Sequence, residues 1–119
     1  MGKRKTPEQL ADEERRYRLA RGAHTPEEFE QLALDPNQAI RAAAAQNPDA
    51  DEQALARFAV DRFWGVRIEV AHHPNASREL VLSLLEADPR KRGVVHHAAR
   101  DRLIAEGVVF DEGGLPVVD

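Results

Sequence analysis

The chain has 119 residues and a net charge of −4; 32% of its residues are charged, 5% are aromatic and none is cysteine. This length fits one domain, and the many Ala, Leu, Glu, Asp and Arg residues favour amphipathic helices over a β-sandwich. Without cysteine there is no disulfide, thiolate zinc site, iron–sulfur cluster or cysteine nucleophile. No apolar run approaches the roughly 20 residues of a membrane span, so we expect a soluble cytoplasmic protein.

A basic amino-terminal arm followed by a capping helix is predicted over residues 1–22. Thr6 precedes Pro7 and lies three residues before Gln9, which is the pattern of a capping box, so a helix is expected from here to about Ala20. Basic side chains outnumber acidic ones in this segment. We expect the helix to cover the first helical pair with a polar outer face.

Two short helices follow, each with its own start signal. Thr25-Pro26-Glu27-Glu28 is a second capping box, and the apolar residues after it fall at helical spacing over 29–33. Asp35-Pro36-Asn37-Gln38 repeats the start signal for a second helix. Asn47-Pro48 ends that helix, because the residue before proline is displaced from the α region.

This helical pair is repeated along the chain. A shift of 26 residues places "DPNQAIRAAAAQNPDADEQALARFA", from Asp35, against "DRFWGVRIEVAHHPNASRELVLSLL", from Asp61. Self-similarity at such a period is typical of stacked repeats. The alignment predicts further helices near residues 51–60, 63–72, 77–87 and 90–106. The predicted buried columns are Ile40 with Val66; Phe29 with Leu55 and Val81; and Leu32 with Phe58 and Leu84.

A decayed third copy is predicted to open at Asp88-Pro89, after one inserted residue near Glu86. In this alignment Gly93 stands where Val66 stood, and His97 falls in the core column of Val70. Residues 107–119 contain the dipeptides Gly-Gly and Leu-Pro, which are typical of turns and loops. They are predicted to form an irregular tail. Its apolar residues Val108, Val109 and Phe110 are expected to fold back on the last unit.

The pattern D-P-x-x-x-[VI]-R-x-x-[VA]-A-x-N-P, followed by x-x-x-x-x-L-x-x-[LF]-A, resembles the variant leucine-rich repeat family. Here it is carried by "DPNQAIRAAAAQNP" with "EQALARFA" and by "DRFWGVRIEVAHHP" with "RELVLSLL". The resemblance implies a right-handed superhelix of alternating α and 3-10 helices with no sheet. The predicted fold is therefore all-α: a short right-handed α-solenoid over residues 23–106. A HEAT-like stack of α-α pairs is the alternative.

Two adjacent histidine pairs, His72-His73 and His96-His97, raise the question of a metal site. Zinc needs three or four ligands in a tetrahedral array, and no carboxylate or third histidine completes a set by spacing. We therefore interpret the histidines as helix-terminating and repeat residues. No metal and no other cofactor is expected.

Arg41 and Arg67 share one column of the repeat, and Asp35 and Asp61 share another. A regularly spaced arginine can contact phosphates. In stacked repeats, however, it more readily binds carbonyl groups or an acid of the neighbouring unit. We expect the structural role.

Two groups of residues are candidates for binding a partner. The first is Phe63 and Trp64: Trp64 either packs across the joint between units or anchors a partner, as tryptophan often does at binding hot spots. The second is the basic cluster Arg90, Lys91 and Arg92, which with Arg100 and Arg102 could meet nucleic-acid phosphates.

The sequence contains no Gly-rich phosphate loop, nucleophile elbow, Walker lysine or H-E-x-x-H motif, so no enzymatic activity is expected. The predicted function is a non-enzymatic binding module whose partner is another protein. A nucleic-acid binder acting through the basic cluster is the alternative. No membrane association is expected, and the protein is expected to be a monomer or to self-associate through its end units.

Overall fold

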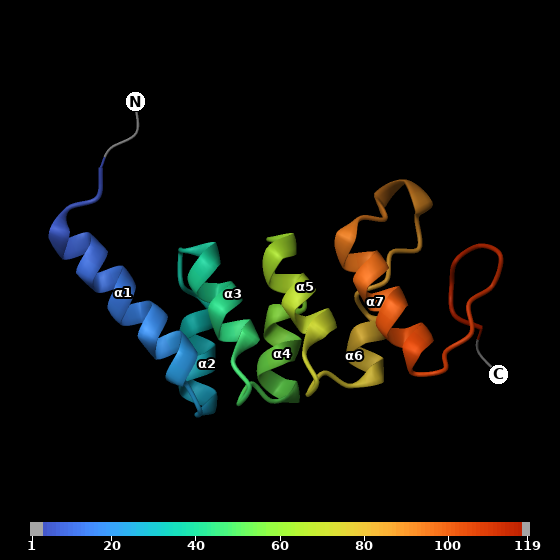
Figure 1. Ribbon diagram of the computed structural model, residues 1–119, viewed down its shortest axis with the longest axis horizontal. Coiled ribbons are helices and arrows are strands. Elements are labelled where there is room, and N and C mark those ends of the chain that lie inside the picture. Colours follow the sequence, from blue (N-terminus) through green and yellow to red (C-terminus); the bar gives the residue numbers. More distant parts are fainter. Residues whose placement is uncertain (1–3, 118–119) are drawn as a thin grey trace.

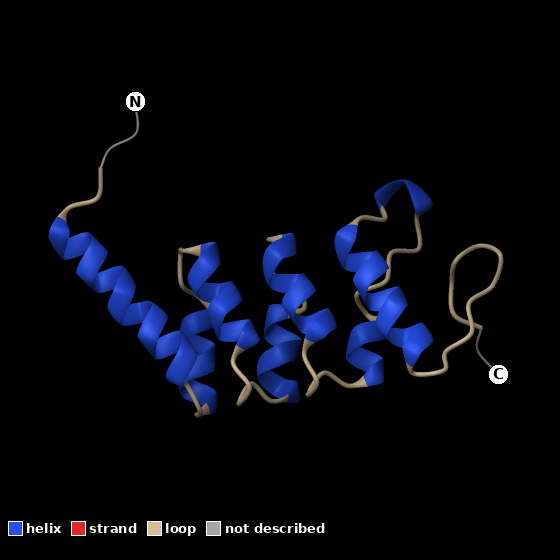
Figure 2. Ribbon diagram, viewed as in Figure 1, coloured by secondary structure: helices blue, strands red, loops and turns tan. Residues whose placement is uncertain are grey.

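The protein is all-helical, as the composition predicts. A computed structural model describes residues 4–117, and within them there are seven α-helices, one 3-10 helix and no strand. Figure 2 shows the helices with the loops between them. The first residues of the predicted basic arm, 1–3, and the last of the predicted tail, 118–119, lie outside the described residues.

From α2 onward the helices form antiparallel pairs arranged in two rows. The helices are α1 (Pro7–Gly22), α2 (Pro26–Ala33), α3 (Gln38–Gln46), α4 (Glu52–Phe58), α5 (Trp64–His72), α6 (Arg78–Leu82), a 3-10 helix (Pro89–Lys91) and α7 (Val94–Ala105). In Figure 1, α3, α5 and α7 lie side by side, with α2, α4 and α6 behind them. Within the front row α1 packs on α3, α3 on α5 and α5 on α7. The molecule is accordingly long and thin, with extents of 54 × 37 × 18 Å.

The helix starts follow the predicted signals. Thr6 and Thr25 both form complete capping boxes with proline in the first turn, which confirms the predicted starts of α1 and α2. Asn37, Asp51 and Ser77 cap α3, α4 and α6 by accepting a backbone N–H with their side chains. Local side-chain chemistry therefore fixes where most of the helices begin.

The second half of the chain departs from the predicted boundaries. Helix α6 ends at Leu82 rather than near residue 87, and α7 begins at Val94 rather than near residue 90. Between them, the Asp88 side chain accepts a hydrogen bond from Arg90 N and starts the 3-10 helix Pro89–Lys91. This turn uses residues that the alignment had assigned to the last helix.

The predicted core columns are buried. The residues at equivalent positions of the back row, Phe29, Leu55 and Val81, and then Leu32, Phe58 and Leu84, all belong to the core. In the front row Ile40 and Val66 are both inaccessible to solvent. The apolar spacing therefore identified the inward faces of α2 to α6.

In α7 the predicted register is wrong. The buried residues are Val95, His96, Ala99 and Leu103, whereas His97 is exposed. Val95, not Gly93, takes the place of Val66, so the predicted alignment is displaced by two residues. The reason is the 3-10 turn, which delays the entry of the chain into the core. His97 therefore does not occupy the column of Val70.

A ladder of Asp and Arg side chains joins successive units. Arg41 is buried, and its Nε and Nη2 donate to the two carboxylate oxygens of Asp61 at 2.8 and 3.2 Å, while its Nη1 donates to Asp35 O at 2.8 Å. Arg16 of α1 donates a single hydrogen bond to the Asp35 carboxylate, through Nη1, while its Nε donates to Asp12. The predicted structural role of Arg41 is confirmed: it binds a carbonyl and an acid of the neighbouring unit.

The ladder sets the charge state of its acid. Burial acts to raise the pKa of Asp61, but the hydrogen bonds from Arg41 and from Phe63 N outweigh it and hold this pKa below its ordinary value. Asp61 is therefore ionised at neutral pH. The ion pair is largely withdrawn from water, with only 3% of the Arg41 side chain and 8% of the Asp61 side chain exposed.

A second set of polar contacts joins the carboxyl ends of the front-row helices. Asn47 Nδ2 donates to Ala20 O and Ala23 O at the end of α1. His73 Nε2 lies 2.8 Å from Asn47 O one unit later. These side chains satisfy carbonyl groups that a helix end leaves without partners.

Arg102 continues this set in the last unit. Its guanidinium donates to the carbonyl oxygens of Ala71, His73 and Ala76. Although the sequence grouped Arg102 with the basic cluster, its side chain is used to hold α7 against the end of α5.

The tail, as far as residue 117, returns to the last helix. Gly107 and Gly114 adopt positive φ angles, and Phe110 and Pro116 form an isolated bridge. Val108 and Phe110 pack against the core as predicted, but Val109 is exposed. An exposed Val109 follows from the alternation of side chains in an extended segment.

The Asp–Arg ladder leads to a prediction on stability. Arg41→Leu leaves the Asp61 carboxylate buried without its partner, so we expect a loss of about 3 kcal/mol or more in the free energy of unfolding, measured by urea denaturation. The matched control is Arg57→Leu, which removes the exposed pair between Arg57 and Glu30. That change is expected to cost about 1 kcal/mol or less. Equal losses in the two variants would contradict the proposed importance of the ladder.

Candidate binding groove

A groove of about 490 Å³ lies between the start of α5 and the start of α7. We call it the α5–α7 groove. It is lined by Trp64, Arg67, Leu84, Glu86, Lys91, Gly93, Val94, Val95 and His96. One residue from each of the two predicted candidate groups, Trp64 and Lys91, lines this groove. The groove opens where the irregular connection between α6 and α7 replaces the short turn found in the earlier pairs.

Phe63 and Trp64 differ in exposure. Phe63 is partly buried and packs against the core, whereas Trp64 keeps 50% of its surface exposed at the groove. Their rings lie 5.6 Å apart at an angle of 50°. The Phe63 ring lies so close to Gly65 that a Cβ at that position would overlap it. Phe63 therefore fixes the start of α5, and Trp64 faces the solvent.

Arg67 forms one wall of the groove. Its Nη1 donates to Asp61 O at 2.7 Å, which repeats the contact of Arg41 with Asp35 O. Within residues 4–117 no carboxylate oxygen lies within 4.0 Å of Arg67, in contrast to Arg41. The predicted contact of Arg67 with a carbonyl group is confirmed, but its contact with a neighbouring acid is not formed.

His96 closes the floor of the groove. Its ring is buried, and its Nδ1 accepts a hydrogen bond from Glu86 N at 2.9 Å. Burial lowers the pKa of His96, and the charges of Arg92, His97 and Arg100 lower it further against the opposing effect of Glu86. The ring is therefore neutral at pH 7, with Nδ1 as the acceptor. In this form it supports the turn that precedes α7.

The basic cluster does not form a continuous cationic face. Arg90 is exposed but paired with Asp88. Arg92 donates to Glu86 O, Ala87 O and Gly113 O, so its guanidinium holds the connection and the tail together. Of the three residues of the cluster, only Lys91 lines the groove. Arg100 lies over the ring of Phe110, with its guanidinium carbon 5.7 Å from the ring centroid.

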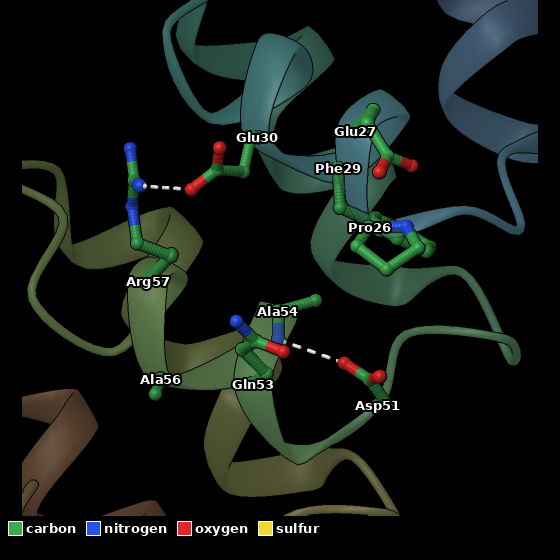
Figure 3. Close-up of a pocket in the computed structure, with 9 residues that line it drawn as sticks. All are labelled: Pro26, Glu27, Phe29, Glu30, Asp51, Gln53, Ala54, Ala56 and Arg57. Carbon is green, nitrogen blue, oxygen red and sulfur yellow. Dashed lines mark hydrogen bonds and ion pairs between the residues drawn. The ribbon is translucent and has the colours of Figure 1, made fainter.

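A second hollow, of about 410 Å³, lies between α2 and α4 on the back row. Figure 3 shows its lining, with Phe29 and Ala54 between the polar residues at its rim. Arg57 Nη1 donates to Glu30 at 2.9 Å, and Asp51 accepts from Ala54 N as the cap of α4. Apart from Phe29 and Ala54 in the core and the cap Asp51, its lining consists mainly of exposed helix positions, which carry no binding motif in the sequence.

The two histidine pairs have different structural roles. His73 is buried, with Nε2 against Asn47 O of the preceding unit and Nδ1 accepting from Asn75 N in its own turn, so one ring nitrogen serves the joint between units and the other serves the turn after α5. His96 and His97 lie edge to face with their centroids 5.3 Å apart. Over residues 4–117 no group of three or more His, Asp or Glu side chains is placed to hold a metal ion. In the same residues no helix combines the length and the apolar character needed to cross a membrane.

Comparison of the chain with protein-family models, with curated proteins and with solved structures finds no match. The geometry of the chain itself is therefore the basis for any functional assignment.

The neutral His96 leads to a prediction on pH dependence. Because its folded-state pKa lies below its ordinary value, its contribution to stability is fully present above about pH 6.5 and is lost as the pH falls through the folded-state pKa. We expect the thermal midpoint to fall between about pH 7.5 and pH 5, and to fall less in His96→Asn, whose amide oxygen can accept from Glu86 N without titrating. The control His72→Asn alters an exposed ring that is not among the groups acting on the pKa of His96, and it should keep the wild-type slope. An unchanged slope in His96→Asn would refute the assignment.

Proposed function

We propose that the chain is a non-enzymatic helical-repeat module that binds a partner protein through the α5–α7 groove. The observation that carries the proposal is the half-exposed Trp64 at the edge of an open groove that also contains Arg67 and Val94. Tryptophan and arginine are enriched among the residues that dominate binding energy at protein interfaces. A cytoplasmic location belongs to the same proposal.

We further propose that the helical pairs form a short right-handed α-solenoid. Support comes from the equivalent burial of Ile40 and Val66 and from the equivalent contacts of Arg41 and Arg67 with the carbonyl six residues earlier. The second helix of each pair is α-helical, whereas the resemblance to variant leucine-rich repeats implies 3-10 helices there. Among the proposed repeat types, this favours the HEAT-like one.

Exposed apolar residues support a protein partner. Leu34, Val60, Trp64 and Val94 are 75%, 81%, 50% and 53% exposed. Leu34 and Val60 follow α2 and α4, and Trp64 and Val94 begin α5 and α7, so all four lie at the ends where the pairs turn. Figure 1 shows these turns along one edge of the molecule. Trp64 and Val94 also line the α5–α7 groove, and exposed apolar side chains at a groove are typical of an interaction surface.

The charges give less support to the nucleic-acid alternative. The chain has a net charge of −4, and three of the arginines considered for phosphate binding, Arg90, Arg92 and Arg102, are engaged within the protein. Affinity for nucleic acids rises with the number of phosphates that free cations can neutralise. We therefore expect a fluorescent DNA or RNA duplex to show no salt-sensitive binding by fluorescence anisotropy. Binding that weakens steeply with salt would favour the alternative instead.

The proposed partner binding is tested by affinity capture from cell extract with quantitative mass spectrometry. Trp64→Ala removes the exposed ring while α5 keeps its buried face, so we expect loss of the captured proteins without loss of the fold, checked by circular dichroism. Leu10→Ala, which removes an exposed leucine on α1, is the matched control and should retain them. Capture of the same proteins at the same level by wild type and Trp64→Ala would contradict the proposal.

A further inference from the structure

Arg67 holds the same position in its helical pair as Arg41 does one unit earlier. Both donate Nη1 to the carbonyl oxygen six residues before them, at 2.7 Å for Arg67 and 2.8 Å for Arg41. These bonds orient the two guanidinium groups alike. The remaining donors of the two groups meet different surroundings.

In the earlier units the remaining donors bind a carboxylate. Arg41 donates two hydrogen bonds to the Asp61 carboxylate, through Nε and Nη2, and Arg16 donates one to the Asp35 carboxylate. In both cases the acid comes from the turn that precedes the next front-row helix. The contacts of Arg41 and Arg16 therefore show that an arginine at this position binds a carboxylate of the next turn.

In the last unit the acids of the corresponding turn do not contact the arginine. Glu86 Oε1 accepts from Asp88 N at 3.2 Å, just as Asp61 Oδ1 accepts from Phe63 N, but unlike Asp61 it forms no ion pair with the arginine of the preceding unit; the Asp88 carboxylate is bound by Arg90. Among residues 4–117 no acid replaces them at Arg67, because no carboxylate oxygen lies within 4.0 Å of it. Arg67 lines the α5–α7 groove.

The rest of the groove defines what would fit beside Arg67. Lys91 supplies a second positive charge, and Glu86 is the one acid among the lining residues. Trp64 and Val94 supply exposed apolar walls. This combination is complementary to a carboxylate that is flanked by apolar groups, and a planar guanidinium favours a carboxylate over a neutral amide through two parallel hydrogen bonds.

We infer that Arg67 is a docking point for an acidic side chain of the partner, and that an internal Asp or Glu flanked by apolar residues takes the place on Arg67 that Asp61 takes on Arg41. This inference rests on the proposed protein-binding function and specifies the chemistry of the bound segment. Trp64 and Val94 contact the apolar flanks. Lys91 adds electrostatic attraction at the rim.

The test uses an array of short peptides with amidated carboxyl termini, so that only a side chain supplies the carboxylate. Each peptide carries a central Asp with varied apolar flanks, and its twin carries Asn at the same position. Selected pairs are then titrated against the full chain in solution. Trp64 is the chain's single tryptophan and lines the groove, so its fluorescence reports binding there.

We expect bound Asp peptides to have affinities roughly ten- to a hundredfold higher than those of their Asn twins. Arg67→Gln should remove this preference, and Arg67→Lys should reduce it, because an ammonium group cannot make the paired contact. Glu86→Gln should strengthen binding of the Asp peptides by removing the competing charge. Arg57→Gln, which alters an exposed arginine at the other hollow, should leave the preference unchanged.

Three results would overturn the inference: no peptide bound, equal affinity for Asp and Asn twins, or a preference that survives Arg67→Gln. Tighter binding of a DNA or RNA oligonucleotide, lost in Arg67→Gln, would assign the site to phosphate instead. Failure of the proposed function is separable. If Trp64→Ala abolishes protein capture but no Asp preference exists, the carboxylate site alone is wrong. If the preference holds but capture does not depend on Trp64, the partner-binding proposal is wrong.

Discussion

Contact between successive helical pairs is the constraint on which the structure depends. In the part of the chain that the structure describes, no helix after α1 is longer than 12 residues, and α6 has only five. Helices of this length are not stable alone in water, so each must bury its apolar face against a neighbour. The columns of Ile40, Val66 and Val95 supply that contact. The ion pair of Arg41 and Asp61 then fixes the position of one helical pair relative to the next. Its two parallel hydrogen bonds would both be broken if the two pairs shifted against each other.

The same ladder explains where the candidate binding groove lies. At the first two joints an acid of the next turn neutralises the arginine, and the units close on each other. At the third joint the connection from α6 to α7 is longer and contains the 3-10 helix Pro89–Lys91, so its acids do not reach Arg67. The longer connection is therefore accompanied by an open groove and, within residues 4–117, by a guanidinium that no carboxylate contacts.

Much of the fold was predictable because it depends on local signals. Thr6 and Thr25 define helix starts through bonds to residues three positions away, and the apolar spacing of Phe29 and Leu32 defines the buried face. The register of α7 was not predictable in the same way. Counting one inserted residue placed His97 in the column of Val70, whereas the displacement of two residues places Ala99 there and leaves His97 exposed. The difference depends on a 3-10 turn that is held by the hydrogen bonds of Asp88 and Arg92.

The sequence by itself determined the helical class, the period of 26 residues between Asp35 and Asp61, and the residues of α2 to α6 that face the core. These features follow from bonds and contacts within one or two helices. Only the tertiary structure decided that Trp64 is exposed while Phe63 is packed, that Arg92 and Arg102 bind carbonyl oxygens, and that Arg67 lacks the acid given to Arg41. Each of these depends on the displacement of one unit relative to the next. That displacement is a property of the assembled stack, because residues far apart in the chain must meet before it is defined.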